Sequence, residues 1–164
     1  MANIDIFDVA SMDSSSNNDD DDGAGTWHRQ QATGDVPDSR ADFCLVTATA
    51  PDNSSYNIYM YGGRDDGRTF DQVYVLSLPS FQWIKVWEGS SPKWGHTCHT
   101  VGSGSSQMIT VGGVPDTDFT NGCDWETKGV GIYNMSNGIW GSVYDAFDES
   151  YQVLPQVYRK IGGR

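Results

Sequence analysis

The sequence predicts an all-β fold made of repeated four-stranded antiparallel units. Three observations indicate this fold: one four-part pattern occurs twice, a pair of glycines ends its second part, and a tryptophan closes its fourth part. Short segments rich in β-branched and aromatic residues, separated by Gly, Pro, Asn and Asp, are typical of strands joined by tight turns. The first copy comprises residues 43–50, 57–63, 72–78 and 81–83, and the second comprises residues 97–102, 107–113, 129–135 and 138–140.

Equivalent positions in the two copies recur at a nearly constant spacing. Gly62 and Gly112 are 50 residues apart, and Trp83 and Trp140 are 57 residues apart. Repeats of about this length that each form one four-stranded sheet are typical of β-propellers, in which each sheet is a blade. The pattern therefore predicts two complete blades.

Alternation along the strands predicts which residues share a face. Ile58 and Met60 should lie on one face of their strand, and Tyr59 and Tyr61 on the other. Both faces are apolar or aromatic, as expected for a sheet that is packed between two neighbouring blades.

The glycine pairs and the late tryptophans are interpreted as structural residues of the repeat. Glycine is expected where the backbone passes close to a neighbouring sheet or takes a positive φ, and tryptophan is large enough to fill the gap between adjacent sheets. The residues with these expected roles are Gly62, Gly63, Trp83, Gly112, Gly113 and Trp140.

The blade pattern divides the chain into four parts and predicts an incomplete propeller, because a closed propeller needs roughly four to eight blades. Residues 3–11 resemble a third strand and Thr26-Trp27 the start of a fourth, with a disordered Asp-rich insertion over residues 12–25 between them. The parts are a partial blade at 1–34, complete blades at 40–88 and 94–144, and the start of a further blade at 151–164.

The net charge of −12 argues against nucleic acid or anionic lipid as a partner, because both bind clusters of Lys and Arg. The aspartate run in the insertion is contiguous, without the spaced ligands of a calcium loop, so we interpret it as a solvated loop. The sequence shows neither a signal peptide nor an apolar stretch long enough to span a membrane.

The repeats resemble kelch repeats of the galactose-oxidase central-domain type, and they are most similar to those of filamentous-fungal kelch proteins. This resemblance implies a propeller in a secreted or cell-surface ectodomain, with a cytoplasmic location as the alternative. The segments that carry the resemblance are residues 32–44, 50–63, 73–86, 94–102 and 123–135.

The resemblance implies a non-catalytic kelch-repeat interaction module, part of a larger propeller, that binds an unidentified protein or glycan without a cofactor. Two alternatives remain open at this point. One is a fragment of a galactose-oxidase-like copper radical oxidase, and the other is an intracellular kelch scaffold.

The copper site of that oxidase family uses two His, two Tyr and a Cys, whereas this sequence has only His28, His96 and His99. His96 and His99 are three residues apart on an expected strand, so their side chains should point to opposite faces and should not share an ion. We therefore expect no catalytic residue and no metal site.

Recognition by a propeller commonly uses the loops at one edge, here residues 34–40, 64–71, 89–95 and 114–128. Arg and Trp contribute most of the binding energy at many interfaces, so the Arg and Trp residues in these loops are candidates for recognition. Trp94 has an alternative role in packing at a blade junction. The candidate binding residues are Arg64, Asp65, Arg68, Lys93, Trp94 and Asp116.

The chain has three cysteines, too few to pair completely. We expect a disulfide between Cys98 and Cys123, because the loop of Cys123 should lie near the start of the strand of Cys98. Such a bridge would indicate an oxidising compartment. The alternative is buried free thiols, and Cys44 would stay free or pair outside this chain.

Two N-glycosylation sequons occur in the sequence. Asn53 lies in an expected hairpin loop and could accept a glycan. Asn134 lies in an expected strand and should not.

Overall fold

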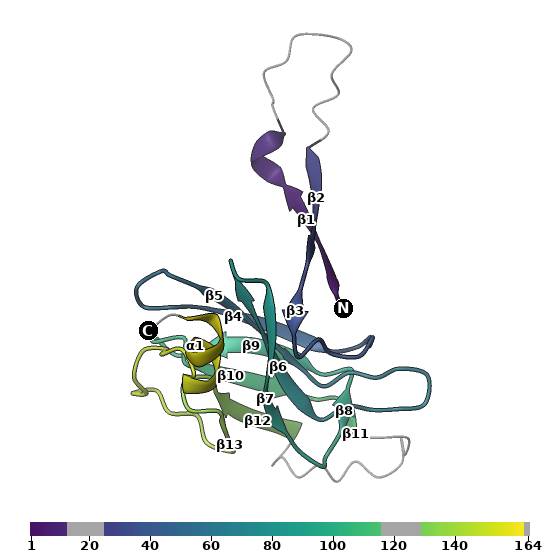
Figure 1. Cartoon of the computed structure of the whole chain (residues 1–164). Helices are drawn as coiled ribbons and strands as arrows, with labels where there is room; N and C mark the ends of the chain where they lie inside the picture. The colour runs from purple at the N-terminus through teal and green to yellow at the C-terminus, as the bar shows by residue number, and fades with distance from the viewer. Residues whose placement is uncertain (13–24, 116–128, 163–164) are drawn as a thin grey trace.

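A computed structural model describes residues 1–12, 25–115 and 129–162. Two antiparallel meanders form the body of the molecule (Figure 1). In each, consecutive strands are neighbours, as expected for a blade. The first blade consists of β4 (Cys44–Thr49), β5 (Tyr56–Tyr61), β6 (Gln72–Leu78) and β7 (Gln82–Glu88), and the second of β9 (Thr97–Val101), β10 (Gln107–Val111), β12 (Val130–Asn134) and β13 (Ile139–Gly141).

The N-terminal segment forms the expected pair of strands. β1 (Asn3–Asp8) is antiparallel to β2 (Thr26–Gln31), and the short 3-10 turn η1 (Val9–Ser11) follows β1. This hairpin projects from the two blades in Figure 1. The chain then joins the first blade through β3 (Thr33–Gly34), which runs parallel to the outer strand β7. Nearly all of the Asp-rich insertion expected to be disordered, residues 13–24, lies outside the described residues.

The C-terminal segment differs from the expectation of an opening strand. Residues Pro155–Ile161 form the helix α1, which packs on β7 and β6. Proline favours the first turn of a helix, and Gly162 ends it in the left-handed conformation with φ 79°, its N–H donating to the Tyr158 carbonyl. Leu154 and Val157 are buried in the core between the blades, which holds this short helix in place. Within the described ranges no helix is both long and apolar enough to cross a bilayer.

The predicted alternation of faces is confirmed in the first blade. Tyr59 and Tyr61 pack in the core between the two blades, together with Met108 and Tyr133 from the second blade. Met60 points the other way and packs with Trp83. The partly buried Met1 and Ile4, at the base of the hairpin, cover the same cluster.

The glycine pairs occupy equivalent positions with matching backbone angles. Gly62 and Gly63 have φ 66° and 93°, and Gly112 and Gly113 have φ 70° and 95°. A Cβ atom on Gly62 would collide with the carbonyl oxygen of Lys93. Both expected reasons for glycine, a positive φ and a close backbone approach, therefore hold for the first pair.

The two tryptophans are also equivalent. Trp83 pairs with Leu76, which in turn pairs with Ile58, and Trp140 pairs with Tyr133, which in turn pairs with Met108. Ile58 and Met108 stand at the same position relative to Gly62 and Gly112. Each packs toward the part of the molecule that precedes its own blade in the chain: Trp83 donates to the Met1 carbonyl at 3.3 Å, and the ring of Trp140 lies 4.7 Å from that of Tyr61.

Candidate functional site

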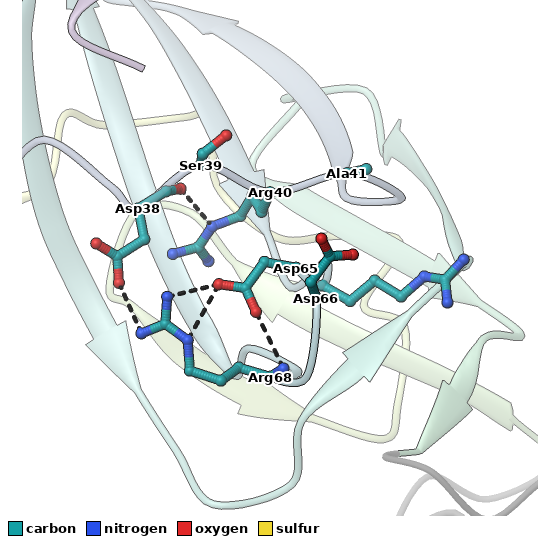
Figure 2. A pocket seen from close by; sticks show the side chains of 8 residues that line it. Asp38, Ser39, Arg40, Ala41, Asp65, Asp66 and Arg68 are labelled. Atoms are coloured by element: carbon teal, nitrogen blue, oxygen red, sulfur yellow. Dashed lines mark hydrogen bonds and ion pairs between the residues drawn. The ribbon is translucent and has the colours of Figure 1, made fainter.

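Two loops at one end of the first blade line an open hollow of about 610 Å³ (Figure 2). One loop precedes β4 and the other connects β5 to β6. The backbone groups of Ala41 and Arg64 donate to each other at 2.8 and 2.9 Å, which joins the loops directly after the Gly62-Gly63 turn. The lining residues are Asp38, Ser39, Arg40, Ala41, Arg64, Asp65, Asp66 and Arg68.

An ion-pair chain crosses the hollow. The Arg68 guanidinium donates to Asp65 at 3.0 Å through Nε and to Asp38 at 3.3 Å through Nη1 (Figure 2). Asp65 also accepts the backbone N–H of Arg68 at 3.0 Å. The hydrogen bond from Arg68 lowers the pKa of Asp65, and the same bond raises the pKa of Arg68. Because all three side chains are accessible to water, these pairs fix the orientation of charge more than they stabilise the fold.

Arg40 lies beside these ion pairs and is only 7% exposed. Its guanidinium donates to the Gly62 carbonyl and the Gln72 amide oxygen, both at 3.2 Å, and lies 3.7 Å from the centre of the Phe70 ring. Burial lowers the pKa of Arg40. Among the residues of known placement, none offers Arg40 a carboxylate within ion-pair distance, so neutral acceptors hold a positive charge beside the hollow.

Arg64 connects the hollow to the segment between the two blades. Its Nε donates to Asp42 at 2.7 Å, and its guanidinium lies 3.9 Å from the centre of the Trp94 ring. Trp94 belongs to β8 (Lys93–Trp94), which pairs with β11 (Val114–Pro115). The alternative role of Trp94, packing at a blade junction, therefore matches its position beneath Arg64.

The expected binding residues separate into three groups. Arg64, Asp65 and Arg68 line the hollow, and Trp94 contacts Arg64. Lys93 was expected in an exposed loop, but its side chain is 1% exposed. Its carbonyl accepts from Gly63 and its N–H donates to Phe70, so pairing of β8 with the first blade buries it. Asp116 lies outside the described residues.

Sequence reasoning identified the loop before β4 but missed Asp38 and Arg40 within it. Nothing local distinguishes Arg40 from the other arginines, because its burial depends on Phe70 and Gln72, which lie about 30 residues later in the chain. Only the general enrichment of arginine at binding sites could have indicated it.

The expected Cys98–Cys123 disulfide is wrong, because the structure pairs Cys98 with Cys44 at a Cα separation of 5.6 Å. Cys44 lies opposite Tyr61, directly before the first glycine pair, whereas the residue opposite Val111 is Thr97. Cys98 is therefore one position beyond the true counterpart of Cys44. A shift of one residue reverses the face, so the two sulfur atoms meet between the blades. Cys123 lies outside the described residues.

The histidines do not form a shared site. His96 is buried just before β9, with its ring 4.9 Å from that of Tyr61. His99 is exposed on β9, and His28 is exposed on the projecting hairpin. The side chains of His96 and His99 therefore do not act as a pair.

The two sequons occupy the expected kinds of position. Asn53 is exposed in the turn between β4 and β5, with φ 57°. Asn134 lies in β12, and its amide donates to Asp148 at 2.7 Å. Glycosylation of Asn53 remains a prediction.

No family model matches the chain. It is 29% identical over 151 residues to a "Kelch repeat-containing protein" from Arthroderma benhamiae, an alignment that covers 88% of this chain and 20% of that protein. It is 28% identical over 100 residues to a "Rab9 effector protein with kelch motifs" from Bos taurus, covering 60% of this chain and 27% of that protein. The chain thus spans between a fifth and a third of the length of these curated relatives. Together with the two four-stranded antiparallel meanders, these similarities support a kelch-type protein with a β-propeller fold.

Proposed function

We propose that the chain is a non-catalytic kelch-repeat interaction module and that the hollow at residues 38–41 and 64–68 binds a protein partner. The observation that carries this proposal is the ordered set of both charge signs around an open surface. Arginines and aspartates that already hold one another's orientation lose little entropy when they exchange these contacts for those of a partner. Each charge that the partner meets must be matched, which gives the surface selectivity.

A polar protein segment fits this surface better than a glycan. The eight lining residues include no aromatic ring, and Arg64 covers one face of the nearby Trp94. The positions of Arg40 and Arg68 favour a partner that presents a carboxylate, because arginine binds carboxylates in a forked, two-bond geometry. A carboxylate would also supply the direct counter-charge that Arg40 has from no residue of known placement.

The test is binding of the full chain to a random peptide array and, in parallel, to a glycan array. We expect peptides rich in Asp and Glu to bind, and Arg68→Ala to weaken their Kd at least about tenfold. Arg29→Ala is the matched control, because Arg29 forms a similarly exposed pair with Asp5 on the hairpin and neither residue lines the hollow. Binding to glycans alone, or an equal loss in both variants, would contradict the proposal.

We further propose that the two blades belong to a larger propeller. Leu45, on the face of the first blade opposite to the second, is half exposed, and Val111 and Ile139 on the far face of the second blade are 43% and 63% exposed. Apolar side chains on a sheet face normally pack against a neighbouring sheet. The isolated chain should therefore self-associate in sedimentation velocity, and a monodisperse monomer with one sharp unfolding transition would overturn the proposal.

We propose a fungal secreted or cell-surface location. The support is the similarity to the Arthroderma protein and the Cys44–Cys98 disulfide, since such bonds persist mainly in oxidising compartments. The tagged protein, expressed in a filamentous fungus from its native gene, should appear in the medium or at the cell surface. Recovery from the cytosolic fraction would favour the intracellular scaffold instead.

A further inference from the structure

Three side chains with metal-binding atoms meet at the junction of the two blades. Cys44 comes from β4, Cys98 from β9, and His96 from the residues just before β9. The two sulfur atoms and an imidazole nitrogen all lie within 4.8 Å of one another. Ligands at about 2.0–2.3 Å from one tetrahedral zinc ion lie about 3.5–3.8 Å apart. The imidazole nitrogen is thus within reach of a shared ion, and the two sulfur atoms, bonded to each other in this structure, must move apart after reduction to reach that separation.

The surroundings hold these ligands in place. Cys44 and His96 are buried, and both cysteines belong to the core between the blades. The imidazole lies against the Tyr61 ring on one side. A Cβ atom on Gly62 would clash with the imidazole Cε1, so the glycine turn leaves room for this ring. Two strands of different blades and one glycine turn therefore define the cluster.

We propose that Cys44, His96 and Cys98 form a redox-gated zinc site. In the oxidised chain the two sulfur atoms are bonded to each other and offer no thiolate to a metal. A dithiol reductant transfers two electrons and two protons to this bond, giving two cysteine thiols while the reductant becomes a disulfide. Zn²⁺ then binds both sulfur atoms and the imidazole, and the two thiol protons pass to solvent.

The donor set selects the metal. Two thiolates and one imidazole suit Zn²⁺, whereas Ca²⁺ and Mg²⁺ require oxygen ligands. Three protein ligands leave the fourth tetrahedral position to water. The covalent bond and the zinc ion would connect the same two blades, so zinc would preserve their junction under conditions that reduce the disulfide.

The experiment uses the full chain in a Cys123→Ser background, which removes the third thiol from the readout. One sample stays oxidised, and the other is reduced with a dithiol that is removed without air. We expect the reduced chain to bind one Co²⁺ ion with the thiolate charge-transfer and tetrahedral absorption bands, and Zn²⁺ to abolish these bands. The oxidised chain should show neither. Absence of the bands in the reduced chain would overturn the proposal.

His96→Gln and His99→Gln form the matched pair, because both replace a histidine near β9 but only His96 belongs to the cluster. We expect His96→Gln to weaken zinc affinity at least tenfold and His99→Gln to leave it unchanged. An equal loss in both variants would overturn the site. A second measurement needs no variant at these positions. Zinc should protect Cys44 and Cys98 of the reduced chain from alkylation, as measured by peptide mass spectrometry, and alkylation at an unchanged rate would overturn the site.

Discussion

The two blades share one strand order but differ in how they are covered. The first blade packs against the second blade on one face, and on the other face its Met60 and Trp83 are covered by Met1 and Ile4 at the base of the hairpin, although Leu45 there stays half exposed. The second blade is packed on the face that carries Met108 and Tyr133. Its other face leaves apolar side chains in water. The same repeat pattern therefore produces a double-sided core or a single-sided one, depending on its neighbours.

The largest contrast should come from removing one large side chain from each environment. Tyr59 is fully buried, and its hydroxyl donates to the Met135 carbonyl at 2.8 Å, whereas Ile139 is 63% exposed. We expect Tyr59→Ala to lower the free energy of unfolding by about 3–5 kcal/mol, and Ile139→Ala by about 0.5 kcal/mol or less. Urea unfolding measures both. Tyr59→Phe isolates the contribution of the hydroxyl group, which we expect to be about 1 kcal/mol. Similar losses of unfolding free energy for Tyr59→Ala and Ile139→Ala would refute the contrast in burial.

The glycine pairs offer a smaller and more local comparison. Gly62 and Gly112 have nearly the same positive φ, so alanine should cost each about 1–2 kcal/mol of backbone strain. Only at Gly62 would the new Cβ also meet the Lys93 carbonyl and His96, while Gly112 has open space around this position. We expect Gly62→Ala to cost about 1–3 kcal/mol more than Gly112→Ala in thermal or urea unfolding. Equal costs would mean that the Lys93 strand moves away easily.

On the exposed face of the second blade, introducing a charged side chain should have a larger effect than shortening an apolar one. Ile139→Lys places a cation on the exposed face that also carries Val111, so it should reduce self-association of the isolated chain at least about fivefold, equivalent to about 1 kcal/mol. Stability of the monomer should change by about 0.5 kcal/mol or less. Sedimentation velocity over a concentration series tests this, with Lys85→Glu on the outer strand of the first blade as the control for a general charge effect.

The smallest expected effect concerns the link between the first blade and α1. Asp35 accepts from Lys160 at 2.6 Å, and that hydrogen bond lowers the pKa of Asp35. A lowered folded-state pKa adds stability above the ordinary value near 3.8, and the gain disappears as the pH falls through the folded-state pKa. Because both groups are partly exposed, Asp35→Asn should cost about 1 kcal/mol or less at pH 7. The difference from wild type should vanish in urea unfolding at low pH, and a difference that grew below pH 4 would reverse the assigned sign.

The sequence predicted well the features that depend on short stretches of chain. Tyr59 and Met60 lie on opposite faces because side chains alternate along any strand. Gly62 and Gly63 take positive φ because the turn that ends β5 requires it. Around the hollow, Arg64, Asp65 and Arg68 could be identified from one loop, whose own turn places them together.

Features that depend on distant partners escaped prediction. Lys93 is polar and follows Pro92 in a segment flanked by Gly89 and Gly95, which is typical of a surface loop, yet its strand pairs with β11 and its backbone bonds to the first blade. Residues 155–161 contain Val, Tyr and Ile, which suit a strand as well as a helix, so the space between the blades and the proline at the first turn decided the outcome.

The cysteines show most clearly where local information ends. The sequence by itself determined the alternation of faces and the positions of the turns, because each follows from a few adjacent residues, and the repeat length, because the pattern occurs twice. It did not determine that Cys98 stands one position beyond the counterpart of Cys44, since this offset depends on how β9 pairs with β10 and how β9 packs on β4. A shift of one residue in strand register moves every side chain of that strand to the opposite face of the sheet. Only the packing of one blade on the next selects the register.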